Sequence, residues 1–237
     1  MTTPSRPESG WLHRLPRNRL LAELSLWSAD LTRLAADIAR VETGTDIFHI
    51  DVADGHFAPA MLFFPDLVAN IRRLTKMPLH VHLMVADAIL SSQIDQFADA
   101  GVDLISVHAE NANAAEAIAH IRARDREAGI VLMLDTSVAA AAPFLGKIST
   151  LTLLGTRIGV KGQGLDTTAV PRLHEARALM SKLVPANRPL LCADGGIRDT
   201  TVPALRAASA DTVVMGSLAF GAPDFAARIA WLHGLSG

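Results

Sequence analysis

Short, nearly continuous runs of Val, Ile, Leu and Ala recur along the chain and alternate with longer amphipathic stretches. Such runs are typical of strands that are buried on both faces, because neither side of the strand meets water. The pattern predicts strands within residues 20–28, 46–54, 78–85, 104–110, 129–136, 150–156, 189–196 and 212–217.

Helical periodicity fills the intervals between these runs. The predicted helices cover residues 30–42, 65–75, 88–100, 112–128, 138–145, 170–183, 199–208 and 224–235. Alternating strand–helix units predict an α/β protein, a single-domain (β/α)8 TIM barrel over residues 20–237. A doubly wound open sheet is the competing fold, but it usually has fewer strands, and no glycine fingerprint follows the first predicted strand.

Two segments stand outside the regular alternation. Residues 1–19 are polar and lack the apolar run of a signal peptide, so we expect a loose N-terminal extension or an arm that packs on a partner subunit. The longest interval between strand starts runs from Thr150 to Pro189 and contains the glycine-bearing loop 157–166. A long loop of this kind on the C-terminal face of a barrel predicts a lid or a phosphate-binding loop.

Composition narrows the function classes. Of 237 residues, 50% are hydrophobic and 19% charged, which is ample material for a core. Lys plus Arg is 22 and Asp plus Glu is 24, so nothing suggests a nucleic-acid partner. No apolar stretch is long enough to span a membrane. The single cysteine, Cys192, excludes an intrachain disulfide and favours a reducing, cytoplasmic setting.

Histidines and aspartates gather where the predicted strands end, which is where a barrel carries its chemistry. His49 and Asp51 share one face of the second strand, His80 and His82 share one face of the third, and Asp194 ends the seventh. One buried histidine is more often an ordinary core residue than a ligand. Three strands that offer His or Asp at one level instead predict a site for a divalent cation, Zn, Fe(II), Mn or Co.

His80 and Asp54 are expected to have supporting roles rather than to bind the metal. His80 lies one layer deeper than His82 and is expected to support a metal ligand rather than to be one. Asp54 follows the second strand and is expected to cap a turn.

Glycines after the last two strands, in Gly195-Gly196 and Met215-Gly216-Ser217, would let backbone N–H groups approach a phosphate.

Together these motifs resemble the ribulose-phosphate 3-epimerase family, from Ser25 to about Ile229. The segments that carry the resemblance are Ser-Leu-Trp-Ser-Ala-Asp at 25–30, His-Ile-Asp-Val-Ala-Asp-Gly-His-Phe-Ala-Pro at 49–59, His-Leu-Met-Val at 82–85, Ile-Ser-Val-His-Ala-Glu at 105–110, Ala-Asp-Gly-Gly-Ile at 193–197 and Met-Gly-Ser-Leu-Ala-Phe-Gly-Ala-Pro-Asp at 215–224.

The resemblance implies a metal-dependent enzyme, an isomerase that epimerises a ketose phosphate, by default D-ribulose 5-phosphate to D-xylulose 5-phosphate. It implies metal ligands at His49, Asp51, His82 and Asp194, with Asp51 and Asp194 as acid and base. It also implies homo-oligomers, since the family forms dimers and hexamers. The substrate-binding positions that it implies are Ser25, Met84, Gly159, Gly162, Gly195, Gly196, Gly216 and Ser217.

The chain also departs from the family pattern. Arg157 and Lys161 bring positive charge into the loop after the sixth strand and are candidate contacts to the phosphate or the sugar. His80 stands where the family usually has Asp, and Ala53 where it usually has Met. The alternatives are therefore another phosphorylated ketose, such as D-allulose 6-phosphate, or a non-catalytic phosphate-binding barrel. Related decarboxylating barrels carry an Asp-x-Lys-x-x-Asp run on the third strand, which this chain lacks.

Overall fold

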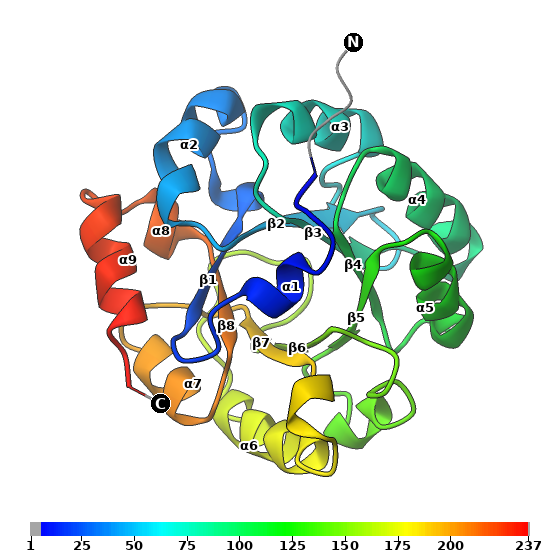
Figure 1. Cartoon of the computed structure of the whole chain (residues 1–237). Coiled ribbons are helices and arrows are strands. Elements are labelled where there is room, and N and C mark those ends of the chain that lie inside the picture. The colour runs from blue at the N-terminus through cyan, green and yellow to red at the C-terminus, as the bar shows by residue number, and fades with distance from the viewer. Residues whose placement is uncertain (1–5, 237) are drawn as a thin grey trace.

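Eight parallel strands close into a barrel in the order in which they occur along the chain, in a computed structural model that describes residues 6–236 (Figure 1). The predicted (β/α)8 TIM barrel is confirmed. The strands are β1 (Leu21–Ser25), β2 (Ile47–Ala53), β3 (Leu79–Met84), β4 (Leu104–His108), β5 (Glu127–Leu132), β6 (Thr150–Leu154), β7 (Leu190–Asp194) and β8 (Thr212–Met215).

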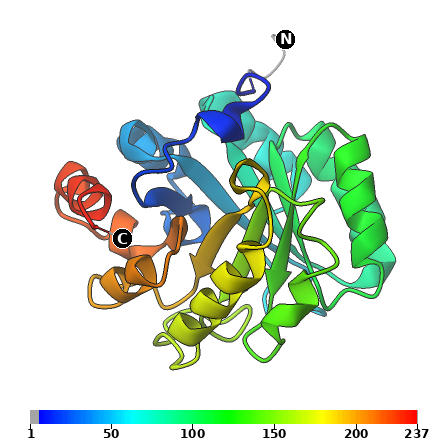
Figure 2. The same cartoon turned by 60° about the horizontal axis from the view of Figure 1, so that its bottom comes forward.

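Helices surround the barrel and cover the outer faces of its strands (Figures 1 and 2). The α-helices are α1 (Trp11–Arg14), α2 (Leu34–Val41), α3 (Pro65–Leu74), α4 (Asp87–Asp99), α5 (Ala114–Ala123), α6 (Ala169–Met180), α7 (Val202–Ala207), α8 (Ser217–Phe220) and α9 (Phe225–His233), and the 3₁₀ helices are η1 (Leu26–Ser28), η2 (Glu42–Gly44), η3 (Val138–Ala141) and η4 (Pro185–Asn187). Strands covered outside and filled inside are buried on both faces, which explains their continuous apolar runs.

The element boundaries differ from the sequence prediction in several places. The helix predicted at 112–128 ends at Ala123, because Asp125 adopts a left-handed conformation with φ 55° and the chain then enters β5 at Glu127. The helix predicted at 138–145 is only the 3₁₀ helix η3. The run at 20–28 contains a strand followed by η1, so Trp27 lies beyond the strand end.

The N-terminal segment lies across one end of the barrel. Helix α1 covers that end in Figure 1, and Figure 2 shows it beyond the strand ends. Trp11 and Leu12 are only 7% and 3% exposed, and they pack against residues near the strand starts, including Leu21 and Ile47. Residues 6–19 of the expected extension thus close the N-terminal end of the barrel, whereas residues 1–5 lie outside the described residues.

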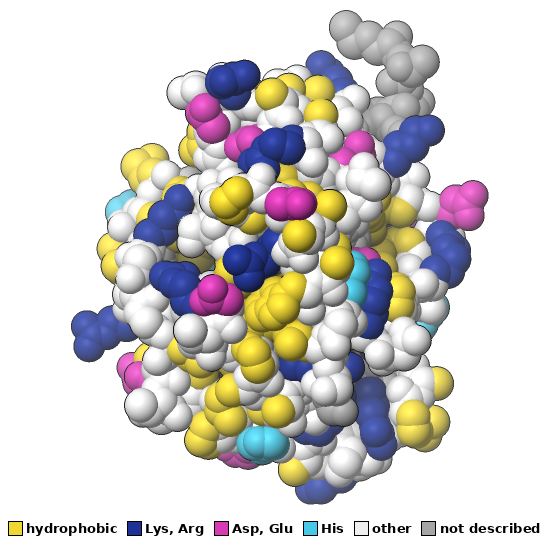
Figure 3. Space-filling view, turned by 90° about the vertical axis from the view of Figure 1, so that its left-hand side faces the viewer, with side chains coloured by type: hydrophobic (Ala, Val, Ile, Leu, Met, Phe, Trp, Pro, Cys, Tyr) yellow, Lys and Arg dark blue, Asp and Glu magenta, His cyan; other side chains and the backbone are white. Residues whose placement is uncertain are grey.

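The outer surface is mixed in character. On the side of the molecule that carries α2 and α9, apolar side chains gather near the middle of the face, with charged side chains around and between them (Figure 3). None of the helices between residues 6 and 236 combines the length and the apolar character needed to cross a membrane.

We expect Trp11→Ala to lower the free energy of unfolding by about 3 kcal/mol, because it leaves a cavity between α1 and the strand starts. Urea denaturation measures the change. Val184→Ala is the control, since Val184 is 65% exposed and should shift stability by less than about 0.5 kcal/mol. A Trp11→Ala protein as stable as the control would show that the segment merely rests on the barrel.

Candidate metal and substrate site

Four polar side chains converge at the C-terminal end of the barrel. His49 and Asp51 project from β2, His82 from β3 and Asp194 from the end of β7. The register pairs Asp51 with His82, which brings these two residues of neighbouring strands to one level. One donor atom from each of the four residues lies within 4.8 Å of the donor atoms of the others. The structure therefore brings together the four side chains that were predicted from the sequence to be metal ligands.

The facing atoms identify which nitrogen each imidazole presents. His49 Nε2 lies 3.2 Å from Asp51 Oδ1 and 3.9 Å from Asp194 Oδ2. His82 Nδ1 lies 3.5 Å and 3.8 Å from the same two oxygens. His82 Nδ1 is buried and has no hydrogen-bond partner among the described residues. A buried nitrogen without a partner is costly unless a cation occupies the space in front of it, so this observation fits a metal ion.

Electrostatics favour a cation at the same place. Burial alone would lower the pKa of His49, but the Asp51 and Glu23 carboxylates outweigh it and hold that pKa well above its usual range. A position that attracts a second proton to an imidazole also attracts a divalent cation. Two imidazole nitrogens and two carboxylates form a donor set that suits Zn, Fe(II), Mn or Co.

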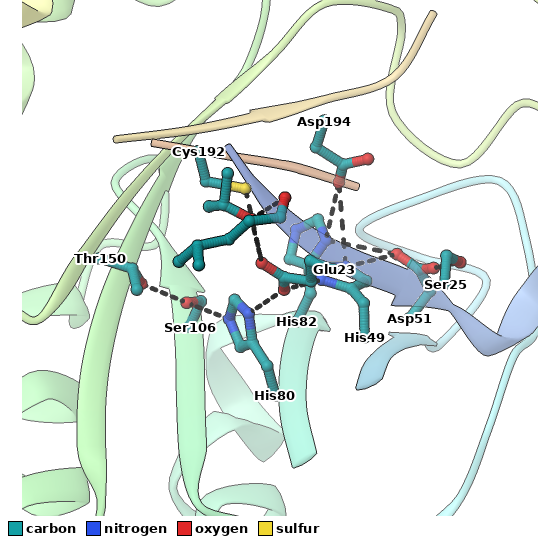
Figure 4. A network of polar contacts seen from close by, with 12 residues as sticks. Glu23, Ser25, His49, Asp51, His80, His82, Ser106, Thr150, Cys192 and Asp194 are labelled. Atoms are coloured by element: carbon teal, nitrogen blue, oxygen red, sulfur yellow. Dashed lines mark hydrogen bonds and ion pairs between the residues drawn. The ribbon is translucent and has the colours of Figure 1, made fainter. Parts of the chain in front are cut away.

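A buried carboxylate holds His49 in place (Figure 4). Glu23 Oε1 lies 2.7 Å from His49 Nδ1 and 2.5 Å from His80 Nδ1, and all three side chains are buried. Each Nδ1–H therefore donates to Glu23, so Nε2 is the nitrogen of His49 that faces Asp51 and Asp194 and that would bind a cation in place of its proton. Ser106 Oγ, 2.6 Å from His80 Nε2, donates to that nitrogen and completes the network.

A second carboxylate supports His82 through another histidine. His82 Nε2 lies 2.8 Å from His108 Nε2, and His108 Nδ1 lies 3.1 Å from Glu110 Oε2. Burial lowers the pKa of His108 to about 4, so its ring is neutral and donates only through Nδ1 to Glu110. His82 must then donate through Nε2, which leaves its Nδ1 lone pair facing the two aspartates.

Their surroundings shift the pKa values of the two aspartates in opposite directions. Burial alone would raise the pKa of Asp51, but His49 and His82 beside it hold that pKa well below its usual range. Burial raises the pKa of Asp194 to about 6, against the effect of His49 and with that of Asp51. A pair of carboxyl groups with separated affinities for protons is the arrangement expected of an acid and a base.

A cavity of about 420 Å³ lies over these groups and extends beneath the loop after β6. Ser25 lines it and donates a 2.7 Å hydrogen bond to Asp51 Oδ2. Met84 lines it from β3. Of the other predicted contact residues, the following also line the cavity: Arg157, Gly159, Lys161, Gly162, Gly195, Gly196, Gly216 and Ser217.

Backbone geometry at the ends of β7 and β8 leaves room for an anion. Gly195 and Gly196 have φ of 91° and 71°, values that side-chain-bearing residues rarely adopt. A Cβ on Gly196 would lie 2.6 Å from the backbone of Leu165. The chain therefore needs glycine here, and the exposed backbone of this turn borders the cavity together with Gly216 and Ser217.

His80 and Asp54, which the sequence analysis also singled out, lie outside the cavity lining. His80 contacts the candidate ligand His49 edge to face, with ring centroids 5.0 Å apart, and shares the Glu23 carboxylate with it. Asp54 accepts hydrogen bonds from the backbone of His56, Phe57 and Ala86, as expected of a turn-capping residue.

Three residues that orient the candidate ligands were not predicted from the sequence: Glu23, His108 and Glu110. Glu23 is a charged residue inside an apolar run, two positions before Ser25 and so on the same face of β1, and that signal was available. His108 ends β4 within the family-like segment 105–110, but only the fold places it against His82.

We expect Glu23→Gln to weaken Zn²⁺ binding by about 10- to 100-fold, because an amide is a poorer acceptor for His49 Nδ1–H and leaves the ring less well oriented. Competition with a chromophoric chelator measures the dissociation constant. Glu175→Gln, on the exposed face of α6, is the matched control. Equal affinities in wild type and a folded Glu23→Gln protein would contradict this role.

Comparison with known proteins identifies relatives of this chain over most of its length. The model of the "Ribulose-phosphate 3 epimerase family" matches residues 21–220. Ribulose-phosphate 3-epimerase 1 of Cupriavidus necator is 35% identical over 204 residues, 84% of each chain. Ribulose-phosphate 3-epimerase of Bacillus subtilis is 33% identical over 213 residues, 89% of this chain and 96% of that protein.

Solved structures add support for the fold alone. A crystal structure of 3-hexulose-6-phosphate synthase superposes with a TM-score of 0.66 at 16% identity, over 92% of this chain and 100% of that one. The extent of the family match and the identity to curated relatives show that the chain belongs to the ribulose-phosphate 3 epimerase family.

Proposed function

We propose that this protein is a metal-dependent 3-epimerase of a ketose phosphate, with D-ribulose 5-phosphate and D-xylulose 5-phosphate as its substrate pair. The observation that carries the proposal is the convergence of donor atoms of His49, Asp51, His82 and Asp194 within 4.8 Å of one another, with Asp51, His82 and Asp194 lining a 420 Å³ cavity. Membership of the ribulose-phosphate 3 epimerase family supports the same reaction.

Epimerisation at C3 requires a proton to leave one face of the carbon and another to arrive on the opposite face, through a planar enediolate. His49, Asp51, His82 and Asp194 would hold a divalent cation, which when bound supplies Lewis-acid stabilisation to developing negative charge on the sugar oxygens. Asp51 comes from β2 and Asp194 from β7, so the two carboxyl groups approach the cavity from different sides of the barrel mouth.

The separated proton affinities suggest the starting roles. Asp51, whose pKa is held low by His49 and His82, begins as the base and takes the C3 proton. Asp194, whose pKa burial raises to about 6, begins as the acid and donates to the opposite face. The roles exchange for the reverse reaction. Ser25 keeps Asp51 oriented through its hydrogen bond to Oδ2.

The rest of the cavity would bind the phosphate group of the substrate, away from the reacting carbon. Backbone around Gly195, Gly196, Gly216 and Ser217 would receive the phosphate, which supplies binding energy away from the reacting carbon. The β6–α6 loop, residues 155–168, covers the cavity with Gly159 and Gly162 and would exclude water from the enediolate. Arg157 and Lys161 in this loop would add positive charge near the sugar phosphate.

A different phosphorylated ketose, such as D-allulose 6-phosphate, is the second candidate substrate. Positive charge in the loop and Ala53, which packs in one apolar cluster with the lining residues Met84 and Ile158, favour it, because both change the surroundings of the substrate. We further propose a cytoplasmic location, supported by the lone free Cys192, and a homo-oligomer, supported by the exposed Met61 and Phe64 after β2.

We expect Asp194→Asn to lower kcat by at least about 10³-fold, because the amide can neither donate nor accept the transferred proton and removes a metal ligand. The rate of epimerisation and the metal content of the purified protein are measured together. Asp66→Asn, on the exposed first turn of α3, is the control. Turnover within tenfold of wild type would exclude the two-carboxylate scheme.

We expect kcat/KM to be highest for D-ribulose 5-phosphate in a panel of ketose phosphates of four to six carbons, because the relatives that cover most of this chain are named for that activity. Coupled or NMR assays measure the rates, with deuterium incorporation at C3 in D₂O as an independent reading. A hexulose phosphate turned over at least tenfold faster would establish the second candidate instead. No exchange with any sugar would favour the non-catalytic alternative.

A further inference from the structure

The β6–α6 loop is internally braced by one side chain. Gln163 Oε1 accepts from the backbone N–H of Arg157 at 3.3 Å, and Gln163 Nε2 donates to the carbonyls of Arg157 at 2.9 Å and Val160 at 2.8 Å. These bonds join the two ends of the segment 157–163. The segment is therefore set up to move as one body rather than residue by residue.

The same segment reaches across the cavity mouth to the chain after β2. Ile158 packs against the small apolar cluster formed by Ala53, Ala58 and Met84. Gly159 lies so close to this region that a Cβ would stand 2.9 Å from Pro59 Cδ and 3.1 Å from Ala58 Cβ. This contact is apolar and closes the β2 side of the mouth.

A second anchor lies on the β1 side and is made by a cation. Lys161 Nζ is 4.6 Å from the centroid of the Trp27 ring and donates a 2.5 Å hydrogen bond to the Trp27 carbonyl oxygen. Within the described part of the chain, Lys161 pairs with no carboxylate. Trp27 belongs to η1, directly after β1, and its ring packs partly against the main core. The β6–α6 loop thus meets an aromatic side chain of the barrel.

We propose that Lys161 is the positioning residue that holds the β6–α6 loop closed, with Trp27 as its anchoring point on the barrel. The consequence for catalysis rests on the proposed function; the anchoring itself does not. Trp27 lies two residues after Ser25, which is hydrogen-bonded to Asp51, so the contact closes the loop beside the proposed base. Loss of the anchor should raise the fraction of time in which the loop is open and the cavity accessible to water.

Limited trypsin digestion of the full-length, ligand-free protein tests the anchor, because cleavage after Arg157 requires the loop to open. Mass spectrometry follows the fragment that ends at Arg157. We expect Lys161→Met, which removes the cation, and Trp27→Ala, which removes the ring, each to raise its initial rate of formation about tenfold, and Trp27→Phe, which keeps an aromatic ring, to raise it less than threefold. Lys147→Met, an exposed lysine before β6, should digest at this bond like wild type.

Coupling between the two residues separates an anchor from general destabilisation. If they act through one contact, the double variant Lys161→Met with Trp27→Ala should be cleaved no more than twofold faster than either single variant. The urea midpoint of Lys161→Met should equal that of wild type, because only local opening changes. Cleavage of Lys161→Met at the wild-type rate, or effects of the two substitutions that multiply, would overturn the proposal.

Kinetics with ketose phosphate then connect the anchor to the reaction. Lys161→Met should raise KM about fivefold or more and lower kcat less, because closure is part of substrate binding. Normal turnover by wild type with unchanged digestion of Lys161→Met would refute the anchor and leave the proposed function standing. Faster digestion of Lys161→Met in a protein that epimerises no ketose phosphate would support the anchor and refute the proposed function.

Discussion

The hydrogen bond from His49 to the buried Glu23 carboxylate determines how the rest of the site is arranged. It fixes the tautomer of the ring and directs Nε2 toward Asp51 and Asp194. Glu110 plays the corresponding part for His82 through His108. Because carboxylates orient both imidazoles, the four donor groups of the candidate cation site already face one another in the protein alone.

The barrel interior holds several buried polar side chains, among them Glu23, His49 and His80, whereas such interiors are commonly filled by branched apolar side chains. Their burial is tolerable here because the groups satisfy one another. Glu23 accepts from His49 and His80 through one oxygen, and its other oxygen lies 3.4 Å from Thr212 Oγ1 and 3.7 Å from Cys192 Sγ. Removing the Glu23 carboxylate would leave the buried Nδ1–H groups of His49 and His80 without their acceptor.

The two ends of the barrel have separate tasks. At the N-terminal end, Trp11 and Leu12 cover the strand starts and contribute to stability. At the C-terminal end, the strand termini carry the site, and the β6–α6 loop forms its roof. Apolar contacts at Ile158 and Gly159 and a cationic contact at Lys161 fasten this loop to the β2 and β1 sides of the mouth. Contacts of this size can break and reform, which a substrate cavity requires and a core does not.

Much of this organisation follows from the chain alone. Apolar runs alternating with helical periodicity predict the barrel, and the alternation of side chains along a strand places His49 with Asp51 on one face. Element ends were less predictable, because capping and the left-handed turn at Asp125 depend on local hydrogen bonds and packing. His80 illustrates the limit: its face and depth could be predicted, but its partner could not.

Local pattern determined which residues face inward, because a strand alternates its side chains with a period of two whatever lies around it. The tertiary structure alone decided which of them meet. Barrel closure and register bring Glu23 to His49, His108 to His82, and Asp194 to Asp51, and the lid contact of Lys161 with Trp27 joins residues 134 positions apart. Such pairings depend on strand register and, for Asp194 with Asp51, on closing the sheet, and no local pattern encodes either.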